Sequence, residues 1–484
     1  MRRREFIKAT AAAALGLAPR QTVFAQDSPM KQDRPNILFI MTDQQHAGMM
    51  SCMGNKWLKT PAMDRLAASG IRFDRAYASN PVCVPSRFSL QTGLMPSVIG
   101  MGQNEDSAEV SVTEAMVEQS LGRLFQKAGY ETAYGGKVHL PKMMNNLQNL
   151  GYRNLTGNSR RELAEACAKF IKGPHAKPFL LFASFINPHD ICYMAINDFS
   201  RSKGETVANN VDSTTCEAVL DLARKSGDVS AFVQANCPPL PPNHAVPEAE
   251  PECITQKYLN IRPFRAYIRQ KWTEDQWRLH RWAYCRLTEM VDEEIGFVLD
   301  ALREAGLEEN TLIVFTSDHG DMDAAHKMEH KSVLYGESLR VPFIMSYKGK
   351  TPAGLVDDKH LISNGLDLLP TLCDYAGIAI PEGLYGRSLR PLADGKDVKE
   401  WRDFVVAETE NGRMLRTGRF KYSIYDSGGH REHLVDLEKD QGEMKNLAEE
   451  AEYKNVMDTH RDLLRRWVER TGDKIAAQYI DVKS

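Results

Sequence analysis

The sequence predicts an α/β protein with a large, mostly parallel sheet sandwiched by helices and a smaller C-terminal α+β subdomain. Three observations predict this fold class. Continuous apolar runs recur before about residue 391, and such runs are typical of strands buried on both faces. Helical patterns alternate with these runs, as they do in parallel sheets covered by helices. Beyond residue 391 the pattern changes to short strand-like segments separated by glycine turns, which indicates a separate subdomain.

The strands of the large sheet are predicted from runs of apolar and β-branched residues. The first run, NILFIMT, is apolar almost throughout, so both faces of its strand are expected to be buried. Similar runs follow along the chain, and a shorter strand is marked by Thr132, Tyr134 and Val138. The predicted strands cover residues 36–42, 132–138, 178–185, 311–316 and 341–347.

The helices between these strands are predicted from start signals and from helical periodicity. Thr60 and Pro61 open the first helix, with Thr60 as its cap and Pro61 in its first turn. Periodic segments, each ending at or beside a glycine, predict helices over residues 114–128, 282–305 and 367–377. The last of these helices is expected to close the large domain.

Residues 191–262 interrupt this alternation, because prolines cluster between residues 238 and 251. We expect this segment to be a long excursion rather than a core element, and long ordered loops often carry function. In the C-terminal subdomain the sequence predicts short strands and a final helix. The strands cover residues 404–408, 414–416, 420–425 and 433–436, and the helix covers residues 452–471.

The N-terminus predicts an export signal. Arg2, Arg3 and Arg4 precede a short apolar run, and small residues follow it up to Ala25. Paired arginines followed by Phe and Lys are typical of a twin-arginine signal, so residues 1–25 are predicted to be a signal peptide for the twin-arginine translocase. The mature protein is then expected to be periplasmic or secreted by a bacterium. The apolar run is too short to span a bilayer, so no stable membrane insertion is expected.

The composition argues against some classes of protein. The 484 residues include 61 Lys and Arg against 64 Asp and Glu, a net charge of −3, whereas a nucleic-acid-binding protein would carry a basic excess. Nine cysteines occur without a C-x-x-C pair or a zinc-like spacing, so most are expected to be plain thiols. A disulfide between Cys216 and Cys237, or between Cys237 and Cys253, could bridge a long loop after export.

Polar residues follow directly after two predicted strands, where open α/β sheets place their ligands. Asp43 and Gln44 follow the first strand, and Asp318 and His319 follow the strand at residues 311–316. Two carboxylates with an amide oxygen and an imidazole could bind one divalent cation. The oxygens favour Ca²⁺ or Mg²⁺, and the imidazole leaves room for a softer metal. Each pair by itself would more often be a helix cap or a turn.

Basic side chains occupy the same kind of position. Lys137 and His139 would lie on one face of an extended segment, because side chains alternate along a strand. His189 follows another core strand, and Lys331 lies in the loop after the second polar pair. Each would by default be an ordinary surface or core residue, but their repeated placement at strand ends indicates one common site.

The most specific motif is the segment C-V-P-S-R-F-S-L-Q-T-G at residues 83–93. It resembles the signature of the type I, formylglycine-dependent sulfatases, a family of the alkaline-phosphatase-like superfamily. Other segments resemble the same family: M-T-D-Q-Q at 41–45, G-G-K-V-H-L-P at 135–141, N-P-H at 187–189, S-D-H-G-D-M at 317–322, and stretches at 414–425 and 435–448. The resemblance spans about residues 35–447, with residues 191–262 the least matched. It implies a catalytic domain over residues 33–385 and a C-terminal subdomain over residues 390–484.

The resemblance implies a metal site. Asp43, Gln44, Asp318 and His319 would hold a divalent cation, Ca²⁺ or alternatively Mg²⁺, and modified Cys83 or bound sulfate would complete its shell. Many relatives have a second Asp where Gln44 stands and an Asn where His319 stands. These two differences remove one negative ligand and add an imidazole.

The resemblance also implies an unusual nucleophile. A formylglycine-generating enzyme would convert Cys83 to an aldehyde before the chain folds. One hydroxyl of the hydrated aldehyde would attack sulfur and expel the alcohol, leaving a covalent sulfate ester on residue 83. His139 would then deprotonate the second hydroxyl, and collapse back to the aldehyde would expel inorganic sulfate by C–O cleavage. An ordinary Ser or Cys lacks that second hydroxyl.

The remaining implied roles concern charge and proton transfer. Arg87 would steady the aldehyde and the metal carboxylates, and Lys137 and Lys331 would grip the sulfate oxygens. Either His189 or Lys331 would protonate the leaving oxygen, and the sequence does not choose between them.

The implied function is hydrolysis of sulfuric esters, with a sulfated polysaccharide or its oligosaccharides as substrate. One alternative is a phosphonate or phosphate monoester hydrolase of the same superfamily. Another is a non-catalytic glycan-binding protein in which Cys83 stays unmodified. We expect substrate contacts from residues 191–262, from residues 265–281, and from exposed loops at Arg413, Arg416 and His430.

Overall fold

The computed structural model describes residues 34–105 and 110–480. The predicted signal peptide at residues 1–25 lies outside the described residues. No helix among the described residues is both long enough and apolar enough to cross a bilayer.

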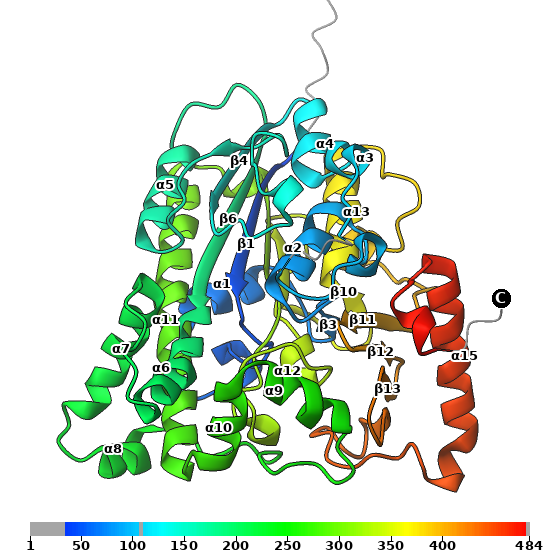
Figure 1. Ribbon diagram of the computed structural model, residues 1–484. Coiled ribbons are helices and arrows are strands. Elements are labelled where there is room, and N and C mark those ends of the chain that lie inside the picture. Colours follow the sequence, from blue (N-terminus) through cyan, green and yellow to red (C-terminus); the bar gives the residue numbers. More distant parts are fainter. Residues whose placement is uncertain (1–33, 106–109, 481–484) are drawn as a thin grey trace, which may run out of the picture. The chain divides into compact units, whose positions relative to one another are not determined.

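An eight-stranded sheet forms the centre of the molecule, with strand order β5-β4-β6-β1-β7-β8-β2-β9 (Figure 1). All neighbouring strands are parallel except β8, which runs antiparallel to β7 and β2. This arrangement confirms the predicted α/β fold and its mostly parallel sheet. The strands are β1 Asn36–Asp43, β2 Ile71–Phe73, β4 Glu131–Gly136, β5 Arg153–Asn154, β6 Phe179–Pro188, β7 Thr311–Ser317, β8 Phe343–Tyr347 and β9 Leu355–Asp357.

The central strand β1 is buried on both faces, as its apolar run predicts. Ile37 and Phe39 belong to one hydrophobic cluster, and Leu38 and Ile40 belong to another on the opposite face. The first cluster includes residues of α2 Cys83–Thr92, α4 Leu121–Lys127 and α13 Asn364–Ala376. The second includes residues of α1 Pro61–Ser69, α5 Arg161–Ile171 and α11 Glu274–Glu304.

Several predicted helices have different ends in the structure. The predicted helix over residues 114–128 is two helices, α3 Glu114–Glu118 and α4, because the backbone at Ser120 is extended. Helix α11 begins at Glu274 rather than at residue 282, behind a capping box formed by Thr273 and Gln276. Thr60 makes no side-chain cap bond to α1. Instead, the backbone N–H groups of Ala62 and Met63 at the start of α1 donate to the carboxylate of Asp292 on α11, at 3.0 and 2.9 Å.

Residues 191–262 are not the long loop that their prolines suggest. The segment contains α6 Cys192–Ser202, α7 Val211–Arg224, α8 Val229–Asn236 and α9 Leu259–Ile261, and α10 Pro263–Lys271 follows it. The prolines lie only in the irregular stretch after α8. In α7 the buried residues Cys216, Val219, Leu220 and Ala223 follow helical spacing, so this insertion has an apolar core of its own.

The C-terminal part has the predicted α+β pattern. An antiparallel sheet of four strands runs β11-β12-β13-β14, and α15 Lys454–Thr471 packs its Leu464 and Trp467 into the same cluster as Leu415 and Tyr422 of the sheet. The described residues belong to one compact unit, so the division between residues 33–385 and 390–484 stays a prediction. The strands of this sheet are β11 Val405–Thr409, β12 Gly412–Arg416, β13 Phe420–Tyr425 and β14 Glu432–Asp436. Other short elements of the chain are β3 Ala76–Tyr77, β10 Ile362–Ser363, α12 Gly336–Leu339 and α14 Arg390–Ala393.

All nine cysteines are free thiols in the structure, and all except Cys52 are buried. The two disulfides considered from the sequence, Cys216–Cys237 and Cys237–Cys253, are therefore wrong. Cys216 and Cys237 belong to the apolar core of the insertion, where they pack as small hydrophobic residues.

Candidate active site

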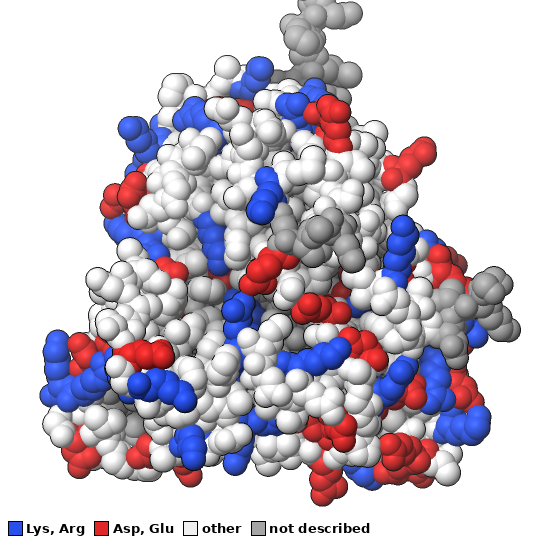
Figure 2. Space-filling view, in the orientation of Figure 1, with Lys and Arg blue, Asp and Glu red and all other residues white. Residues whose placement is uncertain are grey.

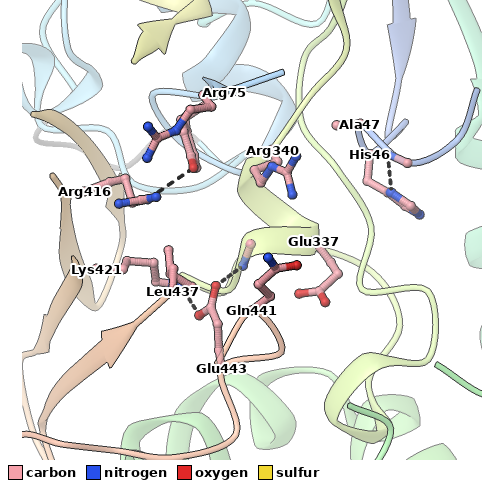
Figure 3. A pocket seen from close by; sticks show the side chains of 13 residues that line it. His46, Ala47, Arg75, Glu337, Arg340, Arg416, Lys421, Leu437, Gln441 and Glu443 are labelled. Carbon is pink, nitrogen blue, oxygen red and sulfur yellow. Dashed lines mark hydrogen bonds and ion pairs between the residues drawn. The ribbon is translucent and has the colours of Figure 1, made fainter. Parts of the chain in front are cut away.

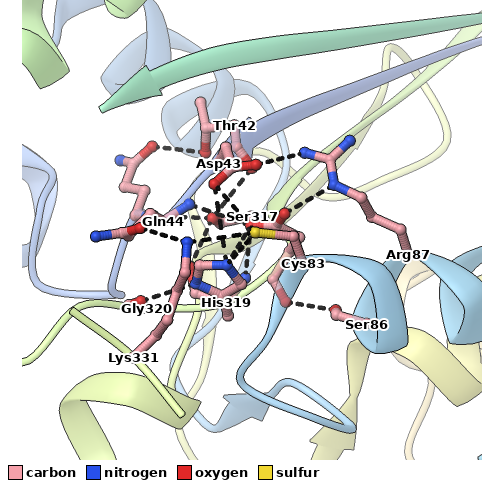
Figure 4. A network of polar contacts seen from close by, with 12 residues as sticks. Thr42, Asp43, Gln44, Cys83, Ser86, Arg87, Ser317, His319, Gly320 and Lys331 are labelled. Atoms are coloured by element: carbon pink, nitrogen blue, oxygen red, sulfur yellow. Dashed lines mark hydrogen bonds and ion pairs between the residues drawn. The ribbon is translucent and has the colours of Figure 1, made fainter. Parts of the chain in front are cut away.

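Four predicted site residues meet where the central strands end (Figure 4). Asp43 is the last residue of β1, Asp318 and His319 follow β7, and Cys83 is the first residue of α2. Ligand atoms of these four side chains all lie within 4.8 Å of one another, and all four side chains are buried. The Cys83 Sγ is 3.2 Å from the His319 Nε2 and 3.9 Å from an oxygen of Asp43.

The sheet topology explains why these residues meet. Strands β1 and β7 are parallel neighbours in register, with Thr42 opposite Ser317, so the residues that follow each strand emerge side by side. The chain then turns at Gln44, whose φ of 66° is left-handed, and the backbone N–H of Gln44 donates to Asp318 at 3.1 Å.

Arg87 connects the two carboxylates. It lies one helical turn after Cys83 on α2, and only 2% of it is exposed. Its Nε donates to Asp318 at 2.9 Å, and its terminal nitrogens donate to Asp43 at 2.8 Å and to the Ser184 hydroxyl at 2.9 Å. Burial disfavours the charge, but Asp318 and Asp43 hold the pKa of the guanidinium above its usual value. Arg87 therefore fixes both carboxylates.

Two lysines place positive charge beside Cys83. The Lys137 Nζ is 2.7 Å from Asp43, and the Lys331 Nζ is 3.3 Å from the Cys83 Sγ. Burial and the negative charge of Asp43 raise the pKa of the Cys83 thiol. Lys137, Lys331 and His319 outweigh both effects and hold that pKa well below its usual value. The surroundings of residue 83 therefore stabilise negative charge.

The donor set suits a divalent cation. Burial and the neighbouring charge of Asp43 raise the pKa of Asp318, because two carboxylates lie side by side away from water. A cation between them would relieve this repulsion, and carboxylate oxygens favour Ca²⁺ or Mg²⁺. The Gln44 amide oxygen instead accepts from the Lys331 Nζ at 2.6 Å and from the Cys192 Sγ at 3.1 Å. The role of Gln44 as a metal ligand stays a prediction.

The two predicted catalytic histidines differ in their surroundings. His189 follows β6, and burial together with the charges of Lys137 and Lys331 lowers its pKa well below the usual value, so its imidazole is neutral. His139 has a left-handed φ of 45°, its Nδ1 is buried without a hydrogen-bond partner, and among the described residues it makes no hydrogen bond to Cys83. The extended segment predicted through Val138 is wrong, because β4 ends at Gly136.

A cavity of about 450 Å³, which we term the Lys331 cavity, opens beside this cluster. Its lining includes both Lys331 and His189. The helical insertion contributes Tyr193, and the segment around α9 and α10 contributes Arg262 and Arg265, so parts of the predicted substrate-contact segments do line it. Its size is within the usual range for small-molecule sites.

The predicted exposure in C-terminal loops is wrong for two of three residues. Arg413 and Arg416 are buried in β12 rather than exposed in a loop, because the strand extends to Gly412. Arg413 pairs with Asp473, and Arg416 lines a different cavity of about 470 Å³ (Figure 3). His430 is exposed but pairs with Glu449 and does not line the Lys331 cavity.

The sequence motifs did not reveal how Gln44 is held. The Gln44 amide nitrogen donates to Asp321 at 2.7 Å, and Asp321 also accepts from the backbone of His330 at 3.1 Å. Asp321 lies inside the S-D-H-G-D-M segment, but nothing in that pattern assigns it a partner. The sequence predicts Cys192 as a plain thiol, whereas in the structure its Sγ donates to the Gln44 amide oxygen.

Comparison with known proteins identifies similar chains. Residues 35–378 match the family model described as sulfatase, and residues 324–470 match the model described as N-sulphoglucosamine sulphohydrolase, C-terminal. The chain is 30% identical to a Delta 4,5-hexuronate-2-O-sulfatase of Bacteroides thetaiotaomicron, over 93% of this chain and 92% of that protein. It is 29% identical to an arylsulfatase of Clostridium perfringens, over 89% and 94% of the two chains.

Solved structures with the same fold include a 2-O GAG sulfatase, with a TM-score of 0.77, 29% identity, and coverage of 93% of this chain and 95% of that chain. The phosphonate monoester hydrolase of Agrobacterium radiobacter also superposes, with a TM-score of 0.67, 21% identity, and coverage of 90% and 96%. At that identity the second similarity establishes the fold alone.

Proposed function

Because the chain belongs to the sulfatase family, we propose that this enzyme releases inorganic sulfate from sulfated carbohydrates through a formylglycine formed from Cys83. The observation that carries the proposal is the setting of residue 83, which is buried between two carboxylates, an imidazole and two lysines. A hexuronate 2-O-sulfatase and a 2-O GAG sulfatase among the similar proteins support a carbohydrate substrate.

The metal and the modification would supply what ordinary side chains cannot. Asp43, Asp318 and His319, with Gln44, would hold Ca²⁺ or alternatively Mg²⁺, and the cation would offset negative charge on the sulfate oxygens. Formylglycine would supply a hydroxyl nucleophile in its hydrated form. The modification requires a formylglycine-generating enzyme as a partner.

The chain's own residues would bind and orient the sulfate group. Lys137 and Lys331 lie beside residue 83 and would bind sulfate oxygens, while Arg87 holds the carboxylates in place. Either Lys331 or His189 would protonate the leaving oxygen, because both line the cavity beside residue 83. General acid help of this kind contributes about 10²–10⁴-fold in rate.

His139 would act as the base that releases sulfate. Its Nδ1 is buried without a hydrogen-bond partner, so the nitrogen is available to accept a proton once the ring reaches residue 83. We further propose that residues 1–25 direct export by the twin-arginine translocase to the periplasm or beyond.

The test compares sulfate esters with phosphate esters. The purified enzyme with Ca²⁺ is assayed on an aryl sulfate, an aryl phosphate, an aryl phosphonate monoester and a panel of sulfated oligosaccharides. We expect sulfate release from the aryl sulfate and from at least one oligosaccharide, with much slower turnover of the phosphorus esters. Cys83→Ala is the control and should be inactive yet folded. Preferred turnover of phosphate or phosphonate would instead support the alternative hydrolase, and binding without turnover would support a glycan-binding protein.

A further inference from the structure

Arg265 is a buried cation without an anionic partner among the described residues. It lies on α10, and only 9% of its surface is exposed. One terminal nitrogen donates to the backbone carbonyl of Tyr258 at 3.2 Å, and the guanidinium stacks 4.1 Å from the centre of the Tyr258 ring. Its Nε has no hydrogen-bond partner. A buried, unpaired charge is costly, so a protein that retains one usually has a use for it.

The other cations of the helical wall around the Lys331 cavity are paired. Lys257 contacts Asp426 at 2.7 Å, and Arg262 contacts Glu105 at 2.8 Å. Figure 2 shows that Lys and Arg side chains are interspersed with Asp and Glu over the viewed face of the molecule. Arg265 departs from this pattern of neutralised pairs, since its nearest partners are a carbonyl and an aromatic ring.

Arg265 also belongs to the cavity that opens beside the proposed reacting group. It lines the same cavity as Lys331 and His189. His330 lines the same cavity, and its Nδ1 contacts the buried Glu329 carboxylate, so this imidazole offers no unpaired cation. The cavity thus has Lys331 at the proposed sulfate position and a second cation, Arg265, that has no anionic partner among the described residues.

We infer that Arg265 binds a second anionic group of the substrate, a carboxylate or a second sulfate, on the sugar whose sulfate ester is cleaved. A planar guanidinium accepts either group through two parallel hydrogen bonds. Glu410, Asn411 and Asn104 also line this cavity, and their side chains can bond to sugar hydroxyls. This inference rests on the proposed function and makes Arg265 a specificity residue rather than part of the sulfate-cleaving machinery.

The experiment uses three sugars sulfated at the same carbon: a hexuronic acid, a disulfated hexose and the monosulfated hexose that lacks a second charge. The value of kcat/KM is measured for the parent enzyme and for Arg265→Met, which keeps the length of the side chain and removes its charge. The matched control is Arg269→Met on the same helix, whose guanidinium is paired with Glu250 and does not line the Lys331 cavity.

The parent enzyme should prefer the carboxylated or the disulfated sugar over the monosulfated one, and whichever is preferred identifies the second group. Arg265→Met should lower kcat/KM for that sugar by roughly 30-fold or more, as expected for the loss of one partner of a buried charge pair. Turnover of the monosulfated hexose should stay within about threefold, which also shows that the variant folds. Arg269→Met should keep the parent's preference.

Two results would overturn the inference while leaving the proposed function intact. One is equal turnover of all three sugars by the parent enzyme. The other is an equal loss on all three sugars in Arg265→Met, which would show a structural role. Absence of sulfate release from every sugar and from an aryl sulfate, with the aldehyde present, would instead refute the proposed function and the inference together.

Discussion

Individual residues of the site were predicted from motifs, but their contacts were not. The Cys83 motif and the polar pairs after two strands pointed to Asp43, Asp318 and His319, and the structure brings all four side chains together. The pairing of Gln44 with Lys331 and Asp321 could not be predicted, because it depends on how loops far apart in the sequence meet. A sequence motif shows which residue types are present, whereas the orientation of a side-chain amide depends on its hydrogen-bond partners.

Asp321 is predicted to act as a positioning residue for Gln44. In Asp321→Asn an amide N–H would face the N–H groups of Gln44 and His330, so the Gln44 amide should rotate. We expect the affinity for Ca²⁺ to fall about 10- to 100-fold, the usual loss when a residue that orients a metal ligand is changed. Isothermal calorimetry measures this affinity directly.

The matched control for that experiment is Asp323→Asn. Asp323 pairs with Arg281 and lies near His46, and it accepts no bond from Gln44. This variant should lose stability but keep its Ca²⁺ affinity. Equal losses of affinity in the two variants would show that general disruption, and not the orientation of Gln44, is responsible.

Secondary-structure elements were predicted best where burial is complete. Strands β1, β6 and β7 have all their residues buried, and their continuous apolar runs made them visible in the sequence. The helices α6, α7 and α8 were missed because the prolines after them dominated the pattern of the segment. The first turns of α11 were missed because Glu274, Asp275 and Arg278 give that stretch a polar composition.

Helix α11 supplies a test through Glu294, which is half-buried on that helix. Burial raises the pKa of this carboxyl to about 7 from an ordinary value of 4.5, although Arg160 and Arg161 lower it in part. The folded state therefore binds this proton more tightly than the unfolded state, and stability decreases as the pH rises from 4.5 to 7.

The variant Glu294→Gln mimics the protonated acid, so its stability should not decrease over this pH range on account of position 294. Its free energy of unfolding should match the parent's below pH 4.5 and exceed it by about 1–3 kcal/mol at pH 8. Urea denaturation at several pH values measures the difference. Glu293→Gln, at an exposed neighbouring position, should show little of this pH dependence. A constant difference at all pH values would contradict the assignment.

At the scale of the whole molecule, polar contacts connect the C-terminal part of the chain with the helices and turns that surround the large sheet. Glu408 on β11 accepts from the backbone and the hydroxyl of Ser97 at 2.9 and 2.6 Å, and Arg402 pairs with Asp367 of α13. We therefore expect residues 33–385 and 390–484 to unfold together. Differential scanning calorimetry should show one transition for the mature protein, and two well-separated transitions would show that the subdomain is independent.

Removal of the metal should destabilise the whole molecule, because the site joins β1, β7 and α2. Chelation should lower the melting temperature, and Ca²⁺ should restore it. A ligand at 100 times its Kd stabilises the folded state by about 2.7 kcal/mol. Asp318→Asn should respond to neither chelator nor Ca²⁺. An unchanged melting temperature of the parent protein after chelation would contradict a metal site at this position.

The central claim, that residue 83 becomes an aldehyde, is tested most directly by mass spectrometry of the tryptic peptide spanning residues 76–87. The protein is produced with and without a formylglycine-generating enzyme, and the aldehyde fraction of that peptide is compared with the rate of sulfate release. We predict that the rate rises in proportion to the aldehyde fraction and vanishes where only the thiol is present. Full activity in protein that carries an unmodified Cys83 thiol would contradict this claim.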